Sequence, residues 1–135
     1  MRIYEGALEA EGKRLSACLI RLENASIVLL DDKETIRLGT LAAAVPEYEG
    51  KHVVASVLLG ERNAVGTRVL AERVSAELGG IALVSMNAEP LTGAASLHPL
   101  MALTMELIEK ATREQRMATE ISLRPATPKE DKEKP

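Results

Sequence analysis

The chain has 135 residues, 46% of them hydrophobic, which suits one compact domain with a single core. Its formal net charge is -3 at pH 7, and its only aromatic residues are two tyrosines. Nucleic-acid binding uses clustered cations and aromatic stacking platforms, so nucleic acid is not an expected partner. No apolar run approaches the roughly 20 residues that span a bilayer, and no secretory pattern opens the chain. We therefore expect a cytoplasmic protein with no membrane partner.

The first half of the chain is rich in extended apolar segments. Residues 14–22 and 26–30 are separated by turn formers, which predicts a hairpin. After a polar turn the extended pattern resumes over 35–45 and stops at Pro46, which predicts a second hairpin that shares the middle strand. A further strand is expected over 51–59, before a glycine. About five strands are expected in this half, of which these four ranges are assigned, while residues 2–11 stay unassigned.

A helix is predicted next, over residues 64–78, because apolar side chains recur there at helical spacing. Asn63 stands at the expected N-cap, and a pair of glycines follows the last helical residue. Residues 81–86 are apolar and predict a short strand. The chain therefore passes from strand to helix and back to strand within this region.

A second helix is expected to begin at Ser96, with a proline in its first turn, and to extend to about Met117. After Leu123 the sequence consists mostly of Lys, Glu, Asp and Pro. Such a segment buries too little apolar surface to offset the entropy lost on ordering. We therefore divide the chain into one domain over 1–121 and a disordered charged tail over 122–135.

This order of elements predicts an α+β fold: an antiparallel-dominated six-stranded sheet with two helices on one face. Strands with water on one side should alternate apolar and polar residues, but these are apolar on both sides. Two helices cover one face only, so we expect a sheet-paired dimer, the alternative being a closed barrel around its own core. The candidate dimer-interface residues are Val28, Leu30, Leu38, Thr40, Val54 and Leu58.

The sequence offers no recognisable catalytic, cofactor or metal site. His52 and His98 are the only histidines, and neither has a second candidate at metal-ligand spacing. The glycines match no phosphate-binding loop, and Asp31 and Asp32 are expected in a solvated turn. The single cysteine, Cys18, excludes an internal disulfide and fits a small buried residue in a reducing compartment. We expect a protein that is not an enzyme and uses no cofactor.

Two short segments carry a resemblance to a known family. They are Ile36-Arg37-Leu38-Gly39-Thr40-Leu41 after a polar turn, and Val57-Leu58-Leu59-Gly60-Glu61 before a helix. Together with the order of elements from about Ala17 to Ile108, they resemble proteasome assembly chaperone 3. The resemblance implies a non-catalytic protein that pairs with itself or a related subunit through its sheet. It also implies that the partner is a proteasome α-subunit, held while the α-ring assembles.

A transient polar contact with the client would involve turns and junctions at the ends of strands. The candidate client-binding residues form two loops: Asp31, Asp32, Lys33 and Glu34, and Glu61, Arg62 and Asn63. Simple helix capping is the competing interpretation of the second loop. Two other functions stay open. One is a roadblock or longin-like dimeric regulator of small GTPases. The other is a small enzyme whose site forms only at the dimer interface.

Overall fold

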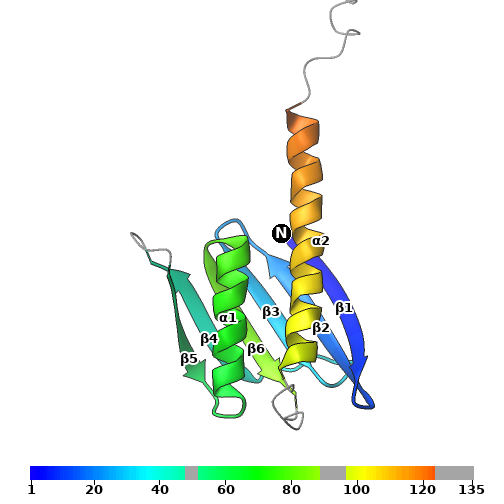
Figure 1. The fold of residues 1–135 in the computed structure, drawn as a ribbon, viewed down its shortest axis with the longest axis vertical. Helices are drawn as coiled ribbons and strands as arrows, with labels where there is room; N and C mark the ends of the chain where they lie inside the picture. Colours follow the sequence, from blue (N-terminus) through cyan, green and yellow to red (C-terminus); the bar gives the residue numbers. More distant parts are fainter. Residues whose placement is uncertain (48–51, 89–96, 124–135) are drawn as a thin grey trace, which may run out of the picture.

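The computed structural model describes residues 1–47, 52–88 and 97–123 as one open sheet with both helices on the same face (Figure 1). The predicted order of five strands, a helix, a strand and a helix is confirmed. The elements are β1 (Arg2–Ala10), β2 (Lys13–Arg21), β3 (Ala25–Asp31), β4 (Thr40–Pro46), β5 (Val53–Leu59), α1 (Ala64–Leu78), β6 (Ile81–Asn87) and α2 (His98–Ser122). Among the described residues, no helix combines the length and apolarity needed to cross a membrane.

The sheet is mixed and has the strand order β1-β2-β3-β6-β4-β5. Four neighbouring pairs are antiparallel, and the central pair, β3 with β6, is parallel. The predicted second hairpin, between 26–30 and 35–45, is wrong because β6 lies between β3 and β4. The chain leaves β3, passes the end of β6 and enters β4 on its far side. Within the part of the chain that the structure describes, β1 and β5 each pair on one side only, so the sheet is open and the closed-barrel alternative is excluded.

The two helices cover different parts of the same face of the sheet (Figure 1). α1 packs on β4, β5 and β6, whereas α2 packs on β1 and β2 and also touches α1. α1 has its predicted bounds. α2 ends at Ser122, five residues beyond the predicted end, and its last turns project past the sheet. Ser96, the predicted cap of α2, lies outside the described residues, and so do residues 124–135 of the tail predicted over 122–135.

Alternate residues of each strand point into the core beneath the helices. In β2 these are Leu15, Ala17 and Leu19, and each is at most 2% exposed. Leucine, alanine and valine make up most of this core. Its largest fully buried apolar side chains are Leu15, Leu19, Val28, Leu30, Leu70, Val74, Val84, Leu103 and Leu107. The core therefore lies on one side of the sheet only.

Candidate functional site

The opposite side of the sheet, which we call the helix-free face, is also largely apolar. One row crosses all six strands through directly paired residues: Ile3, Ile20, Ile27, Leu83, Ala43 and Ser56. A second row runs beside it through Cys18, Leu29, Ser85 and Leu41, and Ser85 is its polar member. Toward the margins, Ile3, Val45, Val54 and Leu58 are each half-exposed or more. A continuous apolar surface of this kind marks a binding site in soluble proteins.

The structure separates the six candidate interface residues. Val54 and Leu58 lie on the helix-free face, 51% and 57% exposed, and Leu38 is exposed in the segment before β4. Val28, Leu30 and Thr40 instead point toward the helices and are buried. This placement has a simple cause. Both sets of alternating residues in these strands are apolar, so the sequence pattern does not distinguish the helix-covered set from the other.

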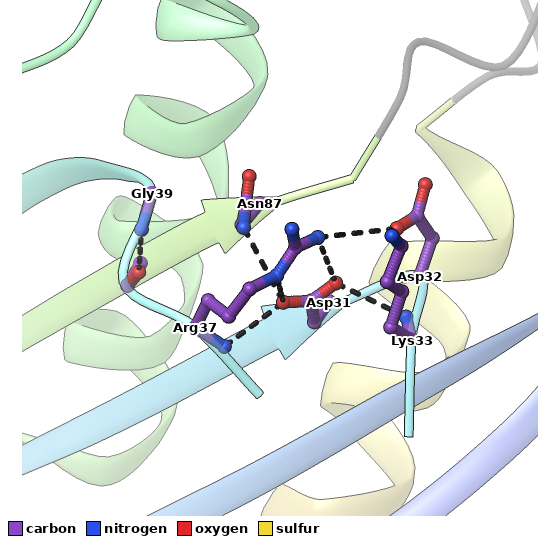
Figure 2. Close-up of polar contacts among 7 residues, drawn as sticks. Asp31, Asp32, Lys33, Arg37, Gly39 and Asn87 are labelled. Carbon is purple, nitrogen blue, oxygen red and sulfur yellow. Dashed lines mark hydrogen bonds and ion pairs between the residues drawn. The ribbon is translucent and has the colours of Figure 1, made fainter. Parts of the chain in front are cut away.

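The polar feature next to this face is Asp31, the last residue of β3. Its carboxylate is fully buried and accepts four hydrogen bonds from the segment that follows (Figure 2). Oδ1 accepts from the Lys33 backbone at 3.0 Å and from Arg37 Nη2 at 3.2 Å. Oδ2 accepts from the Arg37 backbone at 2.9 Å and from Arg37 Nε at 3.2 Å. The expectation of a solvated turn at Asp31 is therefore wrong.

The Asn87 amide, at the end of β6, completes this group of side chains (Figure 2). Its nitrogen lies 3.4 Å from Asp31 Oδ2. With the amide turned over, its oxygen accepts from Arg37 Nε at 3.1 Å and Nη2 at 3.2 Å instead. Either orientation attaches β6 to the pair formed by Asp31 and Arg37. These contacts hold the segment 32–39 across the end of the central strands.

Burial and hydrogen bonding oppose each other at Asp31. Burial alone raises the pKa of its carboxyl group because the charged form loses solvation. The hydrogen bonds and positive charge of Arg37, with the Lys33 backbone, lower that pKa by more, so the net pKa lies below its ordinary value of 3.8. Asp31 is thus charged at neutral pH and satisfied by its own loop, which leaves it no free oxygen to offer a ligand.

Two further contacts bring the second candidate loop to the same end of the sheet. The backbone of Gly39 donates to Ser85 Oγ at 2.9 Å (Figure 2). One residue later, Thr40 Oγ1 donates to the Arg62 carbonyl at 2.6 Å. Asn63 occupies the N-cap position of α1 in a left-handed conformation, but its side chain makes no capping bond and donates to the Ala88 carbonyl at 3.0 Å. The two loops are therefore joined through β4.

The exposure of the seven candidate client-binding residues falls into three groups. Lys33, Glu34, Glu61 and Arg62 are exposed, Asp32 and Asn63 are partly exposed, and Asp31 is buried. Within the described residues, this end of the sheet thus offers both charge signs. Asp31 stabilises the loop from within and is not part of its exposed surface. An acidic residue directly after an apolar strand, with an arginine six positions later, was the available sequence signal for this pair.

The described residues contain no cluster of three or more His, Cys, Asp or Glu side chains suited to a metal ion. His52 and His98 are both exposed. Cys18 lies half-buried on the helix-free face, directly opposite Glu5 in the neighbouring strand. Burial, and to a lesser extent the negative charge of Glu5, raise the pKa of the Cys18 thiol. A thiol with a raised pKa is a poor nucleophile at neutral pH.

Comparison with known proteins identifies the fold. No protein-family model matches the chain, and no curated protein matches it. Among solved structures, the fold is similar to a chain in the crystal structure of a novel chaperone complex for yeast 20S proteasome assembly. The TM-score is 0.53 at 14% sequence identity, and the match covers 86% of this chain and 95% of that chain. The protein therefore has a fold found in a proteasome assembly chaperone complex.

Proposed function

We propose that this protein is a non-catalytic proteasome assembly chaperone that dimerises and binds proteasome α-subunits while the α-ring assembles. The observation that carries the proposal is the apolar helix-free face, on a fold shared with a chain of the yeast chaperone complex. The two short segments that resemble proteasome assembly chaperone 3 support the same reading. The protein would act in the cytoplasm and would need no cofactor.

The helix-free face is the proposed dimer interface. Its central residues Ile27 and Leu83 are shielded only by neighbouring side chains, and no element of the described chain packs above them. A second sheet, stacked about 10 Å away, would cover this surface. Burial of apolar area stabilises such a pair by roughly 25 cal/mol for each Å² removed from water. The second sheet would belong to another copy or to a related subunit.

The polar end of the sheet is the proposed client contact. Lys33, Glu34, Glu61 and Arg62 are exposed there, and Asp31 with Arg37 fixes the shape of the first loop. A chaperone must release its client, which favours a contact made by charged side chains with few apolar anchors. Binding should then weaken as salt rises, because exposed charges are screened over about 10 Å at 0.1 M ionic strength.

Co-expression with the host's proteasome α-subunit, followed by size-exclusion chromatography with light scattering, tests the proposal. The wild-type chain should elute at twice its 14.5 kDa mass or more, and should carry the α-subunit with it. Leu83→Asp should separate the dimer. Val65→Asp is the matched control, because Val65 is 69% exposed on α1, on the helix side of the sheet.

A second pair of variants separates the client contact from the dimer. Reversing two loop charges together, Glu34→Lys with Arg62→Glu, should leave the dimer intact and weaken α-subunit binding. A chain that binds a small GTPase and ignores the α-subunit would favour the GTPase-regulator alternative. A dimer that binds neither would leave the interface standing and contradict the choice of client.

A further inference from the structure

The outer edge of β5 is a second surface that could bind another chain, through the backbone groups that do not pair with β4. β5 is the last strand of the sheet, and its seven residues, VVASVLL, include no charged residue and no proline. Natural proteins usually protect such edges with charges, prolines, bulges or a covering segment, because an exposed ladder recruits another strand. From Val53 to Val57, the described residues provide none of these devices; the register shift opposite Leu41 and Ala42, which leaves Leu58 unpaired, lies beyond this stretch.

The opposite edge, β1, is protected in these ways. Arg2, Glu5 and Glu9 lie along it, and the Lys110 side chain reaches down from α2 to donate to the Glu5 carbonyl at 3.3 Å. Arg2 also forms an ion pair with Glu114 of α2. The two edges of one sheet therefore differ sharply in charge. The charged side chains along β1 disfavour the addition of another strand, so β5 is the edge at which another strand can pair.

The hydrogen bonds of β4 determine which groups of β5 point outward. The Glu47 backbone donates to the His52 carbonyl at 3.0 Å, where the two strands meet their connecting loop. Hydrogen-bonded and non-hydrogen-bonded pairs alternate in an antiparallel ladder. Val54 and Ser56 therefore bond inward to β4, and the backbone groups of Val53, Ala55 and Val57 point away from the sheet.

The pairing of Pro46 with Val53 agrees with this assignment, because a proline has no N–H to give at that position. The side chains of Val53, Ala55 and Val57 are also only partly buried, whereas the equivalent Ala42 and Ala44 of β4 are fully buried. One more strand beyond β5 would satisfy the outward backbone groups and complete the cover over these side chains.

We propose that this strand is the β5 of a second copy, paired antiparallel about a two-fold axis at Ala55. In that register Ala55 faces Ala55 of the other copy, and Val53 and Val57 face each other twice. All three pairs join outward-pointing residues, which gives about six hydrogen bonds between the copies. In this register Val53 and Val57 of one copy each face a valine of the other, and no charged side chain lies opposite an apolar one. The sequence of β5 is therefore compatible with pairing to a second β5.

This edge pairing is distinct from the helix-free face and would not compete with it. Its two-fold axis is perpendicular to the sheet, so the helices of both copies stay on the same side of a continuous twelve-stranded sheet. Two such sheets can still stack through their helix-free faces. The chain would then assemble as four copies, of 58 kDa in total, built from two different isologous contacts.

Disulfide trapping tests the register directly. In a Cys18→Ser background, Ala55→Cys places two thiols on paired residues, whose Cα atoms should lie about 5.5 Å apart, within disulfide range. Val57→Cys is the matched control, because its two copies would lie four residues apart along the strands, roughly 13 Å. Mild oxidation followed by denaturing electrophoresis should give a covalent dimer with Ala55→Cys and none with Val57→Cys.

The mass of the Ala55→Pro variant provides a second readout. Proline at 55 removes an outward N–H but no bond to β4, so the sheet should survive, which circular dichroism would verify. The mass by light scattering should fall by half relative to wild type. Equal trapping of both cysteine variants, or of neither, would overturn the edge pairing. A 29 kDa dimer without trapping would contradict this inference alone and leave the helix-free face dimer standing.

Discussion

Arg37 holds the carboxylate of Asp31 with both its backbone and its side chain. The Arg37 N–H reaches Asp31 Oδ2 at 2.9 Å, and the guanidinium reaches both carboxylate oxygens at 3.2 Å. Asp31 is fully buried, whereas the Arg37 side chain is about half-exposed. The pair therefore fastens the segment 32–39 to the end of the sheet.

Replacing Asp31 should destabilise the fold, because an amide at this position turns a donor group toward other donors. Asp31→Asn is expected to lower the free energy of unfolding by about 2 kcal/mol. Glu34→Gln makes the same chemical change at an exposed position of the same loop, and should cost less than about 0.5 kcal/mol. Urea unfolding of wild type, Asp31→Asn and Glu34→Gln measures these differences in the free energy of unfolding. Equal stabilities would contradict the structural role assigned to Asp31.

The pH dependence of stability should report the same pair. The folded pKa of Asp31 lies below its unfolded value, so its contribution is complete above about pH 4 and is lost as pH falls through the folded pKa. The difference in unfolding free energy between wild type and Asp31→Asn should stay constant from pH 7 to 5 and shrink below about pH 4. A difference that grows on acidification would show that the sign is wrong.

Gly39 should tolerate no side chain. A Cβ atom there would lie 2.2 Å from the Met86 carbonyl oxygen, which belongs to the backbone of the central strand β6. We expect Gly39→Ala to lower the free energy of unfolding by about 3 kcal/mol. Gly12→Ala is the control: its positive φ of 75° costs about 1 kcal/mol, and no atom lies within 4 Å of the added Cβ. Similar losses in thermal unfolding would contradict the close approach.

Cys18 can report whether the helix-free face is covered. Its raised pKa already slows thiol modification at neutral pH, and a second sheet above it would slow the reaction further. We expect Leu83→Asp to speed labelling of Cys18 by a maleimide at least tenfold, measured at pH 7 and equal protein concentration. Val65→Asp should leave the rate unchanged. Identical rates in all three proteins would mean that this face is open in solution.

The sequence was sufficient for the local elements and insufficient for the long-range pairings. The helix over 64–78 could be predicted because its apolar period and its flanking Asn63 and glycines agree with one another. The position of β6 between β3 and β4 could not, because inserting a strand some 50 residues away leaves no local trace in either neighbour. A hairpin is the natural expectation for two strands joined by a short turn, and here it fails.

For the candidate site, too, the local pattern could be predicted and the long-range contacts could not. Strands that are apolar on both sides predicted correctly that the sheet has a second apolar face. They gave no means of choosing its residues, so Val28 and Leu30 were grouped with Val54, although the helices cover them. Asp31 was misplaced for a related reason. A buried carboxylate depends on a partner, and the importance of Arg37 appears only once the loop has closed.

The mass of the purified chain in solution tests the central proposal most directly, measured by light scattering for wild type, Leu83→Asp and Val65→Asp over a range of concentrations. We expect a dimer or tetramer of the 14.5 kDa chain for wild type and Val65→Asp, and a clear loss of mass for Leu83→Asp. A 14.5 kDa monomer at every concentration, identical in all three proteins, would contradict the helix-free face as an interface between copies.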